Sequence, residues 1–194
     1  MTDILVLPSV LGVRPGITDT VERLRAAGHR VEVVDLLDGR TFDSYEPAMA
    51  HRQSLDGEAL EAEALRRSRV VDGPFVTVGF SAGGALAQHV ALRRPEDARG
   101  VVVMGSAMPL QWVGGGEWPS GVPVQEHVGE EDAFDDGPEV RAEFTADMKR
   151  AGVEPEFFTY PGAGHLFNEP SLRGEYDAAA AEAFHARLLA FVGD

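Results

Sequence analysis

The segment that most constrains the fold of this chain is GFSAGG at residues 79–84, centred on Ser81. An apolar run at 74–78 precedes it, and a helix-like run at 85–92 follows it. Small residues on both sides of Ser81 let a strand and a helix approach closely around a strained turn. A strand, a sharp turn with a central Ser and a helix are together typical of a nucleophile elbow, which holds the hydroxyl at the C-terminal edge of a sheet.

Apolar runs and amphipathic segments alternate along the rest of the chain. This alternation predicts a parallel sheet with helices on both faces, in which ligands bind beyond the carboxyl ends of the strands. We expect a single domain over 1–194, with about six to seven mostly parallel strands and no large cap domain. The predicted strands lie at 4–7, 31–35, 75–80, 101–104, 122–128 and 156–160, and the predicted helices at 15–27, 54–69, 138–151 and 177–192.

Charge and composition exclude several classes of protein. The net charge of −15 argues against nucleic acid and anionic membrane surfaces as partners, since both require clustered positive charge. The absence of cysteine excludes disulfides and thiol catalysis and fits a reducing compartment. No run resembles a signal peptide or a membrane span, so we expect a cytoplasmic protein. The composition is compatible with a homodimer.

A histidine after Ser81 is the next requirement, because a serine hydroxyl attacks well only when a neighbouring base takes its proton. In an elbow of this kind the chain order is Ser, then Asp or Glu, then His. His127, His165 and His185 follow Ser81 by enough sequence. His165 comes in a glycine-rich segment directly after the last predicted strand, and we expect it to be the base. We expect His127 at a core edge and His185 on a helix surface.

The acid of such a triad should lie in the loop at residues 129–136, which holds five carboxylates. We select Asp132, because the loop must first leave the strand at Gly129 before a side chain can turn inward. The carboxylates at 135–136 precede a predicted helix and suit capping, and those at 130–131 suit solvent. A metal held by His127, Glu130 and Asp132 matches no common ligand spacing, so we expect none.

Acyl attack also requires two preorganised donors for the oxyanion. One is the backbone N–H of the residue after the nucleophile, Ala82, and the other comes from a loop after an early strand. The loop at residues 8–12 fits this place, and Val10 is the expected donor.

These residues resemble the dienelactone hydrolase family of α/β-hydrolases over essentially the whole chain. The resemblance rests on segments at 10–13 and 35–40, the elbow with its paired glycines, GEEDAF at 129–134 and GAGHLF at 162–167. It implies an α/β-hydrolase fold, no cofactor, and small ester or lactone substrates. The positions that match the family's triad are Ser81, Asp132 and His165.

The chain departs from the family pattern at three places. The name-giving enzymes have a Cys where this chain has Ser81, and a Glu that restrains the thiol where this chain has Ser9. They also hold the substrate carboxylate with an Arg just after the catalytic His, where this chain has Asn168 and Glu169. These departures argue against dienelactone itself as the substrate. The candidates for substrate contact are Ser9, Leu11, Arg40, Phe80, Trp112 and Phe167.

The sequence favours a cofactor-free serine hydrolase for small carboxylic esters or lactones. Two alternatives stay open. One is acyl transfer or another chemistry on the same triad. The other is a non-catalytic binder of small molecules with the same fold, because fold alone does not fix function.

Overall fold

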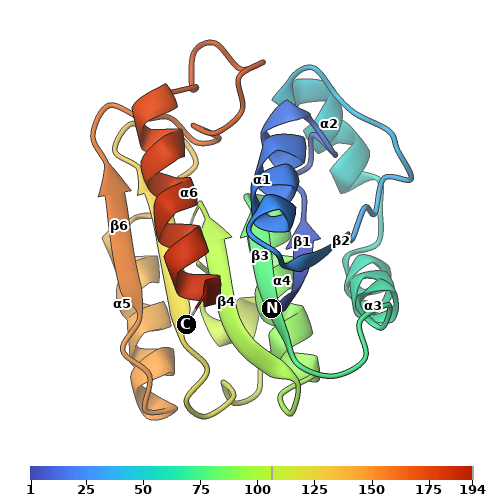
Figure 1. The fold of residues 1–194 in the computed structure, drawn as a ribbon, viewed down its shortest axis with the longest axis vertical. Helices are drawn as coiled ribbons and strands as arrows, with labels where there is room; N and C mark the ends of the chain where they lie inside the picture. The colour runs from blue at the N-terminus through green and yellow to red at the C-terminus, as the bar shows by residue number, and fades with distance from the viewer. Residues whose placement is uncertain (106, 194) are drawn as a thin grey trace.

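The computed structural model describes residues 1–105 and 107–193. Six strands of this part form one parallel sheet, as the sequence predicts, and their order is β2-β1-β3-β4-β5-β6 (Figure 1). All carboxyl ends therefore meet at one edge. The strands are β1 (Asp3–Leu7), β2 (Arg30–Val33), β3 (Phe75–Phe80), β4 (Ala98–Met104), β5 (Val124–Gly129) and β6 (Glu156–Tyr160).

Helices cover both faces of this sheet, so the fold has three layers (Figure 1). The helices are α1 (Pro15–Ala26), α2 (Tyr45–Gln53), α3 (Gly57–Ser68), α4 (Ala82–Arg93), α5 (Gly137–Arg150) and α6 (Ala178–Gly193), with a short 3-10 turn, η1 (Leu110–Trp112).

The two faces of the sheet have separate hydrophobic cores. Residues of β1 alternate between them: Leu5 and Leu7 pack toward α3, α4 and α5, whereas Ile4 and Val6 pack toward α1 and α6. Strand β3 is buried at every residue because both of its faces are covered. The side chain of Phe144 on α5 is fully buried, and its replacement by alanine should cost about 3–5 kcal/mol of stability.

The structure corrects two predicted features between β2 and β3. Helix α2 is absent from the prediction, because only Ala48 of its nine residues is buried and Pro47 lies in its first turn. The next helix begins at Gly57 rather than at 54, since the side chain of Asp56 accepts a hydrogen bond from the backbone N–H of Ala59 (2.9 Å) and caps it. Leu55 consequently lies between the two helices.

Candidate active site

Ser81 lies at the carboxyl end of β3, directly before α4. Its backbone has φ 53° and ψ −123°, a positive φ that non-glycine residues rarely adopt. The turn is held by two hydrogen bonds: the Ser81 N–H donates to the carbonyl of Met104 (2.7 Å), and the Gly84 N–H donates to the carbonyl of Ser81 (2.7 Å). The surrounding structure thus maintains a strained conformation that presents the hydroxyl.

Gly83 allows the start of α4 to press against the end of β1. A Cβ at Gly83 would lie 2.1 Å from the carbonyl oxygen of Leu7 and 2.5 Å from that of Pro8. Only a glycine therefore permits this approach. The contact brings the amide of Ala82 beside the loop that follows β1.

An unbroken chain of hydrogen bonds joins Ser81 to His165 and Asp132. His165 Nε2 lies 2.7 Å from Ser81 Oγ, and His165 Nδ1 lies 2.8 and 2.7 Å from the two carboxylate oxygens of Asp132. The Asp132 side chain is fully shielded from solvent, and that of His165 is 5% exposed. The residues that the sequence selects are therefore brought together in hydrogen-bonding geometry, with the histidine in the middle.

The loops after β5 and β6 hold Asp132 and His165 against each other. At Gly129 a Cβ would lie 2.2 Å from the carbonyl oxygen of Ala163, so the two loops touch through their backbones. The N–H of Glu131 donates to that same carbonyl (3.0 Å). Asp132 also accepts the N–H of Phe134 (2.7 Å), which fixes its carboxylate within its own turn.

Three residues that the sequence does not single out buttress His165. The ring of Phe134 lies 4.8 Å from the imidazole, and that of Tyr45 lies 6.1 Å from it, edge-on. The Tyr45 hydroxyl donates to Glu175 (2.8 Å), whose same oxygen accepts the backbone N–H of Leu166 (2.8 Å). Burial and the neighbouring Glu175 carboxylate raise the pKa of Tyr45 well above its ordinary value, so the hydroxyl stays protonated as a donor.

The sequence contains a signal for the helix that carries Tyr45, but none for the contact that Tyr45 makes. Ser44 before α2 is a residue of the N-cap type, and Pro47 is compatible with a first helical turn, so a helix was predictable there. Nothing in the sequence indicates that Tyr45 reaches Glu175, because 130 positions separate them.

Val10 and Ala82, the two residues whose backbone amides the sequence predicts as oxyanion donors, line one pocket. Within the part of the chain that the structure describes, neither N–H donates to another protein atom. These two N–H groups are the oxyanion donors that the sequence predicts, and their role stays a prediction.

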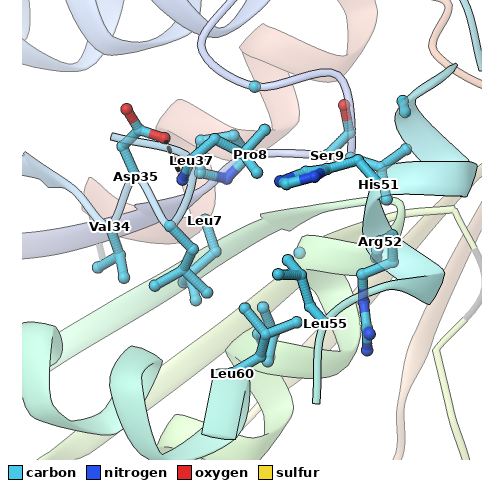
Figure 2. Close-up of a pocket in the computed structure, with 17 residues that line it drawn as sticks. Leu7, Pro8, Ser9, Val34, Asp35, Leu37, His51, Arg52, Leu55 and Leu60 are labelled. Atoms are coloured by element: carbon cyan, nitrogen blue, oxygen red, sulfur yellow. Dashed lines mark hydrogen bonds between the residues drawn. The ribbon is translucent and has the colours of Figure 1, made fainter. Parts of the chain in front are cut away.

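This pocket encloses about 530 Å³ when its part open to solvent is counted, and its lining extends from Ala82 to α2 and α3. Figure 2 shows side chains that converge from the ends of β1 and β2, from α2, from the link to α3 and from α3 itself. Most of the lining is apolar: Leu7, Pro8, Val10, Val34, Leu36, Leu37, Ala48, Leu55, Leu60, Ala82 and Leu86.

Of the candidate contact residues, Ser9 alone lines this pocket, and its Oγ accepts the N–H of Leu11 (3.2 Å). The side chains of Leu11, Phe80 and Phe167 are fully buried in the core between the sheet and α1 and α6.

The other two candidates lie at the surface. Trp112 is 53% exposed on η1, and it does not line the pocket. Arg40 is exposed and borders the outer opening, between the loop after β2 and the start of α3.

The two other candidate histidines lie outside the site. His127 is fully buried in β5, where burial and the charge of Arg187 lower its pKa to about 3. The expectation of a surface position for His185 is wrong: it is 3% exposed, because α6 packs its Nε2 against the hydroxyl of Thr20 on α1 (2.9 Å).

Among residues 1–105 and 107–193 no group of three or more His, Asp or Glu side chains is arranged to hold a metal ion. Over the same residues, no helix has the length and apolar character needed to cross a membrane.

A parallel three-layer fold with Ser81 at a strained strand-to-helix turn defines the class of α/β hydrolases. The sequence matches the Dienelactone hydrolase family over residues 2–194. The chain belongs to the dienelactone hydrolase family and is a hydrolase. A search of curated proteins found no match.

Solved structures with the same fold include several relatives. One is described as the dienelactone hydrolase-like promiscuous phosphotriesterase P91 from metagenomic libraries, with TM-score 0.75 and 20% identity over 99% of this chain and 87% of that one. Another is a putative dienelactone hydrolase from Klebsiella pneumoniae subsp. pneumoniae MGH 78578, with TM-score 0.73 and 18% identity over 100% and 87%. A third is a dienelactone hydrolase from Anabaena variabilis ATCC 29413, with TM-score 0.68 and 21% identity over 98% and 85%.

Proposed function

We propose that this protein is a serine hydrolase that cleaves small carboxylic esters or lactones through an acyl-enzyme. The observation that carries the proposal is the hydrogen-bond chain from Ser81 Oγ through both nitrogens of His165 to Asp132. A nucleophile, a base and an orienting carboxylate in sequence are what serine-based acyl transfer requires.

In the first half of the reaction, Ser81 Oγ forms a bond to the carbonyl carbon of the ester while His165 Nε2 takes the hydroxyl proton. Asp132 accepts the Nδ1–H, which keeps Nε2 free as the acceptor and stabilises the imidazolium that forms. The carbonyl oxygen becomes negative and accepts hydrogen bonds from the amides of Val10 and Ala82. One such donor typically contributes about 3–4 kcal/mol to lowering the barrier.

The tetrahedral intermediate then collapses. The bond from carbon to the leaving oxygen breaks, and His165 Nε2 gives its proton to that oxygen, which releases the alcohol. In the second half, water adds to the acyl-enzyme with His165 again as the base. The bond to Ser81 Oγ breaks, the serine regains its proton, and the carboxylic acid leaves.

The relatives are consistent with this chemistry. Besides the dienelactone hydrolases, the structures that share the fold include metagenome-derived lipolytic enzymes, described as LipS and LipT, with TM-score 0.70 and 17% identity. No metal or cofactor enters the proposed reaction.

The direct test is active-site titration with a fluorophosphonate probe, which bonds covalently to activated serines. The wild type should label stoichiometrically and hydrolyse p-nitrophenyl acetate, whereas Ser81→Ala should lose both properties. Ser120→Ala, at an exposed position far along the chain, serves as the matched control and should behave as the wild type.

Undiminished labelling or ester hydrolysis in a folded Ser81→Ala variant would remove Ser81 from the role of nucleophile. A folded wild type that neither labels nor hydrolyses esters would support the binding-protein alternative. Partition of the acyl group to an added alcohol in preference to water would instead indicate acyl transfer.

A further inference from the structure

The pocket beside Val10 and Ala82 is an apolar chamber. Its position relative to the triad indicates which part of a substrate it would bind. Val10 and Ala82, whose amides would bind the oxyanion, are among its lining residues. The chamber extends between the loop after β2 and the segment from α2 to α3 (Figure 2). A carbonyl group held by those amides therefore has one of its two substituents at the mouth of the chamber.

Proton transfer decides which substituent that is. The leaving oxygen must receive its proton from His165 Nε2, so the alcohol part lies on the His165 side of the carbonyl. None of the triad residues lines the chamber, which comes nearest to them along the chain at Ala82, the residue after Ser81. The part that enters it is consequently the acyl chain, and the alcohol part faces the other way.

The chemistry of the walls selects a neutral hydrocarbon chain. Three leucines line the chamber: Leu37 from the loop after β2, Leu55 from the link between α2 and α3, and Leu60 from α3 (Figure 2). A fourth leucine, Leu86, approaches from α4. None of these four side chains is fully buried, so a ligand can remove them further from water.

The polar groups of the wall offer little to a charged ligand. Both oxygens of Asp35 accept backbone amides of its own loop, from Leu37 (2.9 Å) and Gly39 (2.6 Å). The Ser9 Oγ accepts a hydrogen bond from the N–H of Leu11, which holds this side chain against its own loop. The other polar side chains of the wall, Arg52 and His51, both lie on α2, and the His51 ring packs against that of Phe42 with 5.5 Å between the ring centroids.

We propose that this chamber is the acyl subsite and that the enzyme acts on esters of unbranched, uncharged aliphatic acids of medium length, with Leu60 at the outer limit of the chain. Five residues line both the chamber and its solvent-open extension toward Arg40, and Leu60 is the one of them that lies on α3. This inference rests on the proposed function and specifies its substrate.

The test is a series of p-nitrophenyl esters from acetate to dodecanoate with the wild-type enzyme. Burial of each added methylene should raise kcat/KM about fourfold until the chamber is filled. Leu60→Trp should reduce kcat/KM for octanoate at least tenfold and leave acetate within twofold. The matched control is Leu65→Trp on the same helix, which does not line the chamber and should leave the profile unchanged.

A flat chain-length profile, or equal losses for acetate and octanoate in a folded Leu60→Trp variant, would overturn the proposal. So would a preference of tenfold or more for an ester with a terminal carboxylate on an acyl chain of the same length, which would assign the specificity to Arg52.

A binding experiment separates this proposal from the proposed function. In Ser81→Ala, N-methylalkanamides of increasing length should bind with affinity that rises about fourfold per methylene by calorimetry, whether or not the wild type is catalytic. Fluorophosphonate labelling without this trend would reject the subsite alone. The trend without labelling would keep the subsite and reject the hydrolase mechanism.

Discussion

Acid should destabilise this protein through His127, and the size of the effect follows from where the imidazole lies. Its Nδ1 is 2.7 Å from the Tyr160 hydroxyl. Its ring stacks on that of Phe158 and meets that of Phe184 edge-on, with 5.0 Å between the ring centroids in each pair. Burial, together with the charge of Arg187, lowers the pKa of His127 from 6.5 to about 3. The native protein therefore holds this side chain neutral at pH values where an unfolded chain protonates it.

The sign and magnitude follow from proton linkage. As the pH falls below about 6.5, His127 binds a proton in the unfolded chain but stays neutral in the native state. The free energy of unfolding therefore decreases until about pH 3. At pH 5 the protonated form of an unperturbed imidazole outnumbers the neutral form about 30-fold. The free energy of unfolding is therefore lower by about 2 kcal/mol than it is at neutral pH. That is a considerable part of the 5–15 kcal/mol by which domains are typically stable.

Urea unfolding at pH 7.5 and pH 5.0 measures this contribution as a difference. The wild type should lose about 2 kcal/mol more between the two pH values than His127→Gln does. Tyr160→Phe is the matched control: it removes the hydroxyl partner but keeps the buried imidazole, so it should lower stability at both pH values and retain the wild-type difference. An identical pH difference in the wild type and His127→Gln would refute the reasoning.

Three further predictions concern the site. Asp132→Asn should reduce kcat by about 10³–10⁴-fold, because an amide N–H facing His165 Nδ1 moves the ring proton to Nε2. Steady-state ester hydrolysis measures this loss, and an undiminished kcat would contradict it. Tyr45→Phe should lower kcat about fivefold by removing one hydrogen bond to Glu175, and an unchanged kcat would show that the hydroxyl does not position the histidine loop. Gly83→Ala should cost about 3 kcal/mol or more in urea unfolding, because its Cβ would lie 2.1 Å from a carbonyl oxygen of β1, and wild-type stability would exclude that contact.

Much of the fold was predictable because its signals are local. Strands β3 and β6 have the predicted bounds, since each is a short apolar or aromatic run with clear breaks around it. Helix α2 was missed because its only buried side chain is Ala48, which gives no apolar periodicity. The sequence predicts a surface position for His185 because the apolar pattern of α6 does not show that the face carrying His185 packs on α1.

The sequence by itself determined the candidates for the nucleophile, the acid and the base. Chain order, the glycine-flanked turn around Ser81, and the loops after two late strands suffice for that, because parallel strands bring their carboxyl ends to one edge. Only the tertiary structure decided what surrounds those residues. The Tyr45–Glu175 hydrogen bond and the leucines of the acyl chamber join segments far apart in the chain, and no local pattern encodes such contacts.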